Sequence, residues 1–345
     1  MKPTRWRDAM DRALYGPDGF FVSGAGPAAH FRTSVHASPV FAAALLRLVE
    51  QVDATLGHPP VFQVVDVGAG RGELLRALAT AISPATTAAA GPPLADRVRL
   101  TAVERAARPD DLPAEIGWCD EIPTGIVGLL TATEWLDNVP LDLAVPTDDG
   151  WRYLLVDPTT GTESVGEPVD PADRDWLDHW WPSTGGGMAG RAEIGRSRDE
   201  AWADAVGRVE RGLALAVDYG QLRDDRPVDG TLTGYRNGRQ VPPVPDGSCD
   251  VTAHVAMDSV ASAGERVARC AYSLMVQREA LRALGADGGR PPLSLAGSDP
   301  AGYVRALAAA SAAAELTDPA GLGGHWWLLQ PVGVHHRYGG PSMAR

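Results

Sequence analysis

Three glycines at alternate positions stand between an apolar run and a stretch with helical periodicity. The segment VVDVGAGRGELL places Asp66 near the end of the run and Gly68, Gly70 and Gly72 in the turn that follows. Glycine there allows a positive φ and a close approach of the backbone to a ligand. The spacing GxGxG is one residue shorter than the GxGxxG fingerprint that holds a pyrophosphate over a helix N-terminus. The turn therefore predicts a cofactor without phosphate, whose ammonium Asp66 balances directly or through water. S-adenosylmethionine has that form.

Two further acids follow the next apolar runs. RLTAVE ends at Glu104, where a carboxylate can accept hydrogen bonds from both ribose hydroxyls. Asp120 follows the weaker run near residues 116–118 and can accept a hydrogen bond from an adenine amino group. Alone, a glycine turn is often a plain strand-to-helix connection, and an acid at a strand end is often an ordinary surface residue. In this order and at these strand ends, the three features predict an adenosine cofactor.

Seven apolar runs predict the strands of the sheet that would carry these acids. The first few alternate with connections long enough for crossovers, which favours a parallel, doubly wound α/β sheet. We expect the last run to form a closing edge strand after an alanine-rich helix over residues 303–316. The runs are Val61–Val67, Val98–Val103, Ile116–Trp118, Ile126–Ala132, Leu213–Val217, Val267–Tyr272 and Trp326–Val332.

The chain divides into four predicted parts. Residues 1–60 form an N-terminal helical lid, and residues 61–145 form the cofactor-binding half of the core. Residues 146–205 are rich in Pro, Gly, Asp and Trp, include a predicted hairpin around 151–156, and are interpreted as an insertion that covers the site. Residues 206–345 supply the rest of the core.

Composition limits the classes of function. The net charge of −13 opposes nucleic-acid binding, which needs a basic stripe. No stretch reaches the roughly 18 apolar residues of a membrane span, and the N-terminus lacks a signal-peptide core, so we expect a cytoplasmic protein. The three cysteines contain no CxxC pair, and His335 and His336 lack a matching ligand pair, so we expect no metal site.

Eight sequence blocks occur in an order that is more specific than any single motif. Together they resemble the MidA-like S-adenosylmethionine-dependent methyltransferases, whose mitochondrial member assists respiratory complex I assembly by methylating an arginine. The blocks are YGPDGFF (15–21), HFRTSVHASPVFA (30–42), VDVGAGRGELL (65–75), TEWLDNVPLD (133–142), LAVDYG (215–220), GTLTGYR (230–236), DVTAHV (250–255) and VQREALRALG (276–285).

This resemblance implies a seven-stranded Rossmann-like class I methyltransferase fold, with S-adenosylmethionine as the donor and S-adenosylhomocysteine as the product. It also implies that Thr33 and Ser34 bind the cofactor, and that the segment from His30 to Phe41 folds over it. The chain departs from the family where Ala29 and His30 replace Gly-Asp and His36 replaces a Glu. Since the glycine turn is intact, these departures concern the methyl acceptor more than the reaction.

The family signature at residues 133–140 reads TEWLDNVP here and retains two acids, Glu134 and Asp137. They follow the fourth strand and should face the methyl donor, because ligands lie beyond the carboxyl ends of the strands. Two carboxylates can grip a guanidinium, orient one nitrogen for in-line attack and favour loss of its proton. In the alternative interpretation, Asp137 caps the following helix and Glu134 pairs with an arginine.

Three more residues are candidates for the acceptor side. Asp218 and Tyr219 close the fifth strand and could shape the acceptor pocket, or Asp218 could simply satisfy a buried Tyr219 hydroxyl. His254 could serve as a base, because its ordinary pKa lies near neutrality, or it could be structural. Trp176, Trp180 and Trp181 could form an aromatic wall or pack within the insertion.

The leading functional hypothesis is a methyltransferase that acts on a protein nitrogen, an arginine by resemblance. A small-molecule O- or N-methyltransferase is the second hypothesis, favoured by the altered block around Phe31 and by the aromatic insertion. The third is a non-catalytic assembly factor that keeps S-adenosylmethionine as a structural ligand.

Overall fold

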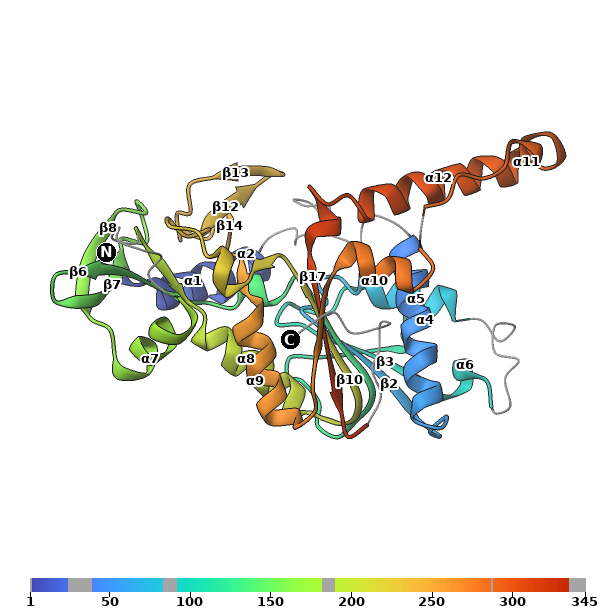
Figure 1. Ribbon diagram of the computed structural model, residues 1–345, viewed down its shortest axis with the longest axis horizontal. Coiled ribbons are helices and arrows are strands. Elements are labelled where there is room, and N and C mark those ends of the chain that lie inside the picture. The colour runs from blue at the N-terminus through green and yellow to red at the C-terminus, as the bar shows by residue number, and fades with distance from the viewer. Residues whose placement is uncertain (1, 24–38, 83–91, 182–189, 287, 335–345) are drawn as a thin grey trace.

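A seven-stranded sheet forms the centre of the molecule, in the order β16-β17-β10-β5-β2-β3-β4 (Figure 1). The computed structural model describes residues 2–23, 39–82, 92–181, 190–286 and 288–334. The pairs from β4 to β10 are parallel, whereas β17 runs antiparallel to both β10 and β16. The seven-stranded α/β fold predicted from the sequence is confirmed. The strands are β2 Phe62–Val67, β3 Val98–Val103, β4 Ile116–Cys119, β5 Ile126–Thr133, β10 Val209–Asp218, β16 Ser273–Val276 and β17 Trp326–Val332.

The strand predicted at Val267–Tyr272 is wrong. Helix α9 (Met257–Ala268) occupies the start of this run and ends at Arg269, which has a left-handed φ of 53°. The strand begins only at Ser273, which pairs with Leu329. The run includes Val267 and Ala268, the last two residues of that helix, and a short apolar run cannot by itself distinguish a helix end from a strand.

The strand at Trp326–Val332 is present, but its predicted edge position is wrong. β17 lies between β10 and β16, and all of its residues after Trp326 are buried. The edge is β16, whose four residues are all partly exposed. Burial on both faces explains why WWLLQPV reads as a continuous apolar run rather than an alternating one.

Helices cover both faces of the sheet and form two cores. Val64 packs in one core with α4 (Pro39–Thr55) and α5 (Glu73–Ala81). The next residue, Val65, packs in the other core with α8 (Arg196–Gly207) and α9. Successive side chains of a strand point to opposite faces, so β2 contributes to both layers.

A second, smaller sheet lies beside the main one (Figure 1). Helix α7 (Pro171–Trp180) and helix α1 (Trp6–Tyr15) pack on it. The predicted hairpin is formed by β6 and β7, and β6 begins at Asp142, four positions before the predicted start of the insertion. Its strands are β1 Thr4–Arg5, β6 Asp142–Thr147, β7 Gly150–Val156, β8 Glu163–Pro168 and β9 Ala192–Ile194.

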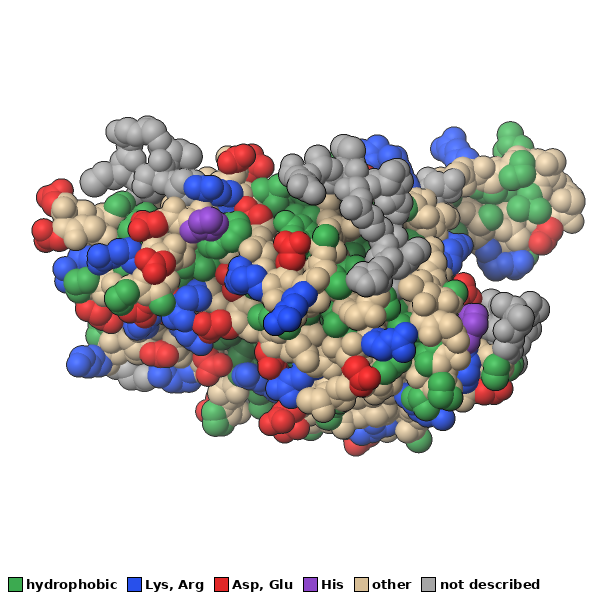
Figure 2. All heavy atoms as spheres, turned by 60° about the horizontal axis from the view of Figure 1, so that its bottom comes forward, with side chains coloured by type: hydrophobic (Ala, Val, Ile, Leu, Met, Phe, Trp, Pro, Cys, Tyr) green, Lys and Arg blue, Asp and Glu red, His purple; other side chains and the backbone are tan. Residues whose placement is uncertain are grey.

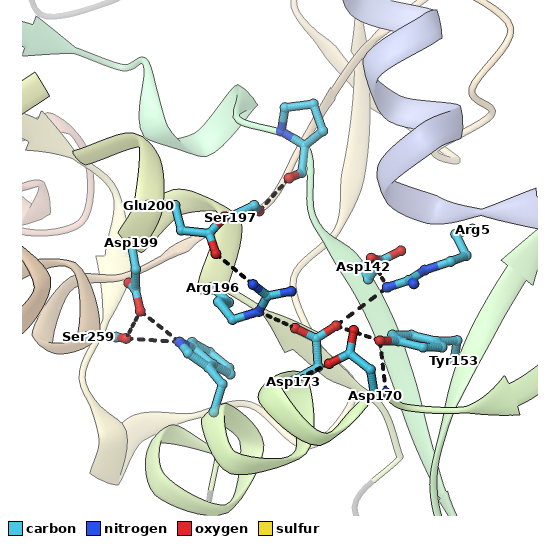
Figure 3. Close-up of polar contacts among 12 residues, drawn as sticks. Arg5, Asp142, Tyr153, Asp170, Asp173, Arg196, Ser197, Asp199, Glu200 and Ser259 are labelled. Atoms are coloured by element: carbon cyan, nitrogen blue, oxygen red, sulfur yellow. Dashed lines mark hydrogen bonds and ion pairs between the residues drawn. The ribbon is translucent and has the colours of Figure 1, made fainter. Parts of the chain in front are cut away.

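Asp173 of α7 is the centre of a buried polar network that ties this sheet together (Figure 3). Its carboxylate accepts hydrogen bonds from Tyr153 Oη at 2.6 Å and from Arg196 Nε at 2.6 Å. Arg5 lies 3.4 Å from the same carboxylate and 2.5 Å from Asp142. The network links β1, β6, β7, α7 and α8, so the N-terminal strand is fixed to residues far along the chain.

Most of the remaining elements surround the carboxyl edge of the main sheet or project from it, whereas α6 leads into the start of β3. Helices α11 and α12 extend away from the body as an arm (Figure 1). On the face shown in Figure 2, acidic and basic side chains are interspersed. No helix in the described part of the chain has the length and hydropathy to cross a bilayer. These elements are α2 Phe20–Ser23, α6 Leu94–Arg97, η3 Leu136–Asn138, β11 Gly220–Gln221, η4 Arg223–Asp225, β12 Thr233–Arg236, β13 Arg239–Val241, β14 Asp250–Thr252, β15 Val255–Ala256, α10 Gln277–Ala283, α11 Leu293–Ser298, α12 Pro300–Leu316 and η5 Leu322–Gly324.

Asp199 is a buried carboxylate where α7, α8 and α9 meet. Its Oδ2 accepts hydrogen bonds from Trp176 Nε1 at 2.8 Å and from Ser259 Oγ at 2.5 Å (Figure 3). Burial raises the pKa of Asp199 to about 6, although the two hydrogen bonds oppose this shift. The folded state therefore keeps the proton of this carboxyl to a higher pH than the unfolded chain does.

Asp199→Asn should remove a pH dependence of stability. The unfolded pKa is about 3.9, so the wild type loses about 3 kcal/mol of unfolding free energy as this group ionises between about pH 4 and pH 7. Asparagine cannot ionise, and the stability of the variant relative to the wild type should rise by that amount over the same range. Urea unfolding at several pH values measures the difference. Asp204→Asn, on the exposed face of the same helix, is the control and should follow the wild type. Equal pH slopes in Asp199→Asn and the wild type would contradict the prediction.

Candidate active site

A cavity of about 830 Å³ opens at the carboxyl ends of the parallel strands. Its wall includes residues that end or follow β2, β3, β4, β5 and β10, which is where ligands bind in sheets of this kind. The volume is within the range of ligand pockets. The predicted site residues that line it are Gly68, Gly70, Glu104, Asp120, Glu134 and Asp137.

The glycine turn after β2 requires glycine for two reasons. Gly68, Gly70 and Gly72 have φ values of 70°, 58° and 79°, which side chains rarely adopt. A Cβ at Gly68 would also lie 2.9 Å from Trp135 Cδ1, and one at Gly72 would lie 2.7 Å from Leu112 Cδ1. Gly68 and Gly70 line the cavity, whereas Gly72 precedes the first residue of α5. The turn thus exposes backbone to the cavity, where a side chain would fill the space.

Glu104 is held against this turn by backbone amides. Its Oε2 accepts a hydrogen bond from Gly70 N at 3.1 Å, and its Oε1 accepts from Arg105 N at 2.7 Å and Ala106 N at 3.3 Å. A carboxylate can accept about four hydrogen bonds, so capacity for a ribose hydroxyl remains. Asp120 lies in the same cavity wall and is exposed. These positions fit the predicted roles at an adenosine.

Asp66 lies behind the turn and is 2% exposed. Its Oδ1 has no hydrogen-bond partner among the described residues. Burial raises the pKa of Asp66 well above its usual range, and Glu73 and Glu104 raise it further. A buried carboxylate with an unfilled acceptor atom fits a cationic ligand beside the turn, because a nearby positive charge would stabilise its ionised form.

The other two predicted cofactor residues, Thr33 and Ser34, lie outside the described residues, as do His30 and most of the segment predicted to fold over the cofactor. His335 and His336 also lie outside them. Among the residues that are described, no three His, Cys, Asp or Glu side chains are arranged to hold a metal ion.

Glu134 stands at the end of β5 in a left-handed conformation, with a φ of 52°. Its amide donates to the carbonyl of Val217 at 2.8 Å, which ties the turn to the neighbouring strand β10. A residue other than glycine in this region costs about 1 to 3 kcal/mol and persists only where its surroundings impose it. Here the surroundings impose the left-handed conformation on Glu134, a half-buried residue of the cavity wall.

Asp137 lies within the short helix η3 and is 3% exposed. Its Oδ2 accepts hydrogen bonds from the Tyr219 hydroxyl and, at 2.8 Å, from Thr252 Oγ1. Its Oδ1 has no partner among the described residues. The interpretation of Asp137 as a helix cap is wrong, because its side chain bonds to β14 and to the end of β10 instead of to the first amides of a helix.

The idea that Asp218 satisfies the Tyr219 hydroxyl is also wrong. Asp218 Oδ2 accepts the amides of Leu136 at 3.0 Å and Asp137 at 3.3 Å, and the residue is 1% exposed. Tyr219 lines the cavity, whereas Asp218 is not part of its wall. Adjacent residues of a strand point to opposite faces, which separates the two side chains.

Asp250 is a further carboxylate of the cavity wall, and the sequence analysis missed it. It is 5% exposed, and its Oδ1 accepts a hydrogen bond from Asn138 Nδ2 at 2.7 Å. Burial raises the pKa of Asp250 well above its usual range, with contributions from Asp137 and Glu134. The sequence feature that could have identified Asp250 was its position at the start of the block DVTAHV. Asp250 begins a strand rather than ending one, so the rule for strand ends did not select it.

Two histidines flank Tyr219 in the wall. The ring of His254 lies 5.2 Å and that of His325 lies 5.6 Å from the Tyr219 ring, between centroids. Burial lowers the pKa of His254 and lowers the pKa of His325 to about 4. Both are therefore neutral at pH 7. His325 was missed because it precedes the apolar run of β17 without any motif of its own.

Arg198 is a buried cation beneath the acids, 1% exposed. Its guanidinium donates to the carbonyl oxygens of Asp137 at 2.5 Å, Val139 at 3.1 Å, and Ala253 and His254 at 2.9 Å each. It comes from α8, in the part of the chain predicted as an insertion. Ala201, also on α8, is the one residue that lines the cavity among the described residues of that part. The covering role predicted for residues 146–205 stays a prediction.

The comparisons with known proteins agree with this arrangement. Two solved structures from Burkholderia thailandensis share the fold. A COG1565 superfamily member bound to S-adenosyl-homocysteine has 22% identity and a TM-score of 0.78, over 97% of this chain and 89% of that one. A native COG1565 superfamily structure has 23% identity and a TM-score of 0.74, over 97% and 88%. No curated protein matches the chain.

A family model provides the assignment. Residues 41–275 match the model described as "Putative S-adenosyl-L-methionine-dependent methyltransferase". This match spans more than half of the chain and includes the glycine turn, Glu104, the acids after β5 and Tyr219. It confirms the resemblance found in the sequence blocks, and the chain therefore belongs to this family of S-adenosylmethionine-dependent methyltransferases.

Proposed function

We propose that the chain transfers a methyl group from S-adenosylmethionine to a protein nitrogen, an arginine guanidinium. The observation that carries this proposal is the set of three carboxylates, Glu134, Asp137 and Asp250, in the wall of the cavity that also contains the glycine turn. Carboxylates in a largely buried site favour a cationic acceptor over a neutral one. The Burkholderia relative that binds S-adenosyl-homocysteine supports the choice of donor.

The cofactor half of the proposed site consists of Asp66, Gly68, Gly70, Gly72, Glu104 and Asp120, with Thr33 and Ser34 from the undescribed segment. Its backbone approaches the ligand at Gly68 and Gly70, and Glu104 accepts the ribose hydroxyls. Bound there, S-adenosylmethionine supplies an electrophilic methyl group on a sulfonium sulfur. The acceptor half then has to present a nitrogen lone pair in line with that methyl group.

Glu134 and Asp137 orient this nitrogen and receive its proton. Each carboxylate accepts an N–H of the guanidinium, which fixes the plane of the group. The nitrogen lone pair forms the new bond to carbon, the electrons of the old carbon–sulfur bond stay on sulfur, and the proton passes to a carboxylate. The neutral His254 and His325 border this space and add no competing positive charge.

A small molecule with a basic nitrogen is the second candidate acceptor. Aromatic side chains of Tyr15, Phe21, Trp135, Tyr219 and Tyr235 line the cavity, as is common in sites for small ligands. Incubation with methyl-labelled S-adenosylmethionine and a lysate of the source organism distinguishes the two acceptors. Label in protein that is recovered as methylarginine supports the proposal, and label in small molecules supports the alternative. Donor binding without any transfer would favour the assembly-factor hypothesis.

Gly70→Val should abolish binding of S-adenosylmethionine. A branched side chain at a φ of 58° strains the turn, and its Cβ would lie 3.3 Å from Glu73 Oε2 and enter the cavity wall. Calorimetry of the folded variant measures the affinity. Gly57→Val is the matched control, because Gly57 has a φ of 75° and no atom near its Cβ position. It should bind like the wild type. Unchanged affinity in Gly70→Val would refute the assignment of the turn.

Glu134→Gln should separate donor binding from turnover. The shape of the side chain is kept, but the charge that orients and deprotonates a guanidinium is lost, so transition-state stabilisation should fall by roughly 3 to 4 kcal/mol. The affinity for S-adenosylmethionine should change little. Label transfer and calorimetry measure the two quantities.

Glu210→Gln is the control for this variant, because Glu210 is exposed near the opposite end of β10 from the cavity. It should leave both quantities unchanged. If Glu134→Gln weakens donor binding in proportion to its loss of rate, Glu134 is a cofactor residue. If neither quantity changes, the acid has no part in the reaction.

A further inference from the structure

Two hydroxyl groups converge on one oxygen of Asp137. The Tyr219 hydroxyl and Thr252 Oγ1 both bond to Asp137 Oδ2, the latter at 2.8 Å, and they lie 2.5 Å from each other. The three residues come from the end of β10, from β14 and from η3, so only the tertiary fold brings them together. Tyr219 and Asp137 both line the cavity.

This arrangement leaves the two oxygens of the carboxylate in different states. Oδ2 is occupied by the two hydroxyls, whereas Oδ1 is buried and has no partner among the described residues. The backbone of Asp137 is fixed as well, because its carbonyl accepts from Arg198 and its amide donates to Asp218. A carboxylate held at both its backbone and one oxygen loses little freedom when a ligand binds to the other oxygen.

We propose that Tyr219 and Thr252 are positioning residues for the methyl acceptor. The two hydroxyls hold Asp137 so that its Oδ1 receives an N–H of a guanidinium. This inference rests on the proposed function, because it specifies how the acceptor side of that same site is preorganised. Neither hydroxyl touches the reacting nitrogen in this arrangement. Both act through Asp137.

The same hydrogen bonds favour the ionised form of Asp137. Burial raises the pKa of Asp137, and the bonds from Tyr219 and Thr252 oppose this effect, as does the positive charge of Arg198. Loss of one hydroxyl should therefore raise the pKa further and reduce the charge available to a cation. The other charged or titratable groups around Asp137 are Tyr15, Glu134, Asp218, Asp250 and His254.

The experiment measures binding of a simple acceptor analogue, so it needs no knowledge of the natural substrate. N-acetyl-arginine amide is titrated into the protein saturated with S-adenosylhomocysteine, from pH 5 to pH 9, and N-acetyl-citrulline amide serves as the neutral analogue. In Tyr219→Phe, the ring contacts with His254 and His325 can remain while the hydroxyl is lost. We expect the affinity for the arginine probe at pH 7 to fall by about tenfold, the scale of one hydrogen bond to a charged group.

The pH profile should change with the affinity. The acidic limb of arginine-probe binding should move to higher pH in Tyr219→Phe and in Thr252→Val, because loss of a hydroxyl raises the pKa of Asp137. Thr252→Ser keeps the hydroxyl and should restore the wild-type profile. In Asp137→Asn, adding Tyr219→Phe should cause no further loss, since the tyrosine acts through the carboxylate.

Tyr153→Phe is the matched control, because Tyr153 also donates to a buried aspartate, Asp173, at 2.6 Å (Figure 3). Tyr153 does not line the cavity. It removes the same kind of hydrogen bond and should leave probe binding and its pH profile unchanged. Affinity for S-adenosylhomocysteine should be retained in every variant, which shows that each one is folded.

The outcomes separate this inference from the proposed function. If the wild type does not prefer the arginine probe to the citrulline probe, the guanidinium acceptor is wrong and the inference fails with it. If the wild type prefers arginine but Tyr219→Phe binds it equally well with an unshifted pH profile, the positioning role is overturned and the proposed function stands. An additive loss in the double variant would likewise overturn the role through Asp137.

Discussion

The buried guanidinium of Arg198 is the interaction on which the acceptor side of the cavity depends. It bonds to carbonyls on both sides of the site, at Asp137 and Val139 and at Ala253 and His254. These segments leave the sheets at that point, and the guanidinium supplies donors to their carbonyls, because a buried carbonyl without a donor is costly. Burying the cation is also costly, and the nearby carboxylates of Asp137, Glu193 and Asp218 offset that cost. One side chain from α8 thereby fixes the loops that carry Asp137, Asp250 and His254.

The sequence predicted the sheet well where each strand is a self-contained apolar run. β2, β3, β5 and β17 differ from the predicted runs by at most one residue at either end, because apolar residues predominate in each of these strands. The prediction was wrong at Val267–Tyr272, since the last residues of a helix can have the same composition as a short strand. It also misplaced β17 at the edge, because composition reports burial and says nothing about which strands are neighbours.

The residues of the candidate site also fall into those that a local sequence rule locates and those that only the tertiary fold brings together. Glu104 and Glu134 could be found because parallel strands bring their carboxyl ends to one edge, so a local rule locates them. Asp250 and His325 could not, since Asp250 begins β14, His325 precedes β17, and both reach the cavity only through long-range packing. Arg198 lies in a region of the sequence without any motif. The structural role of Arg198 depends on hydrogen bonds to carbonyls up to 61 residues away in the sequence, and no local pattern predicts such bonds.

Carboxylates at this edge carry an energetic cost that the proposed reaction explains. Burial raises the pKa of Asp66, Asp137, Asp218 and Asp250, so each of them opposes its own ionisation in the folded protein. Under the proposed reaction, a sulfonium and a guanidinium must approach within bonding distance of one methyl group. Two unit charges 4 Å apart repel by about 4 kcal/mol at the effective dielectric of a protein surface. Fixed negative charge around both cations counters this repulsion without reorganisation at the moment of reaction. Under the proposed reaction, the burial of Asp66, Asp137 and Asp250 costs folding free energy, and the same three carboxylates stabilise the two cations that react.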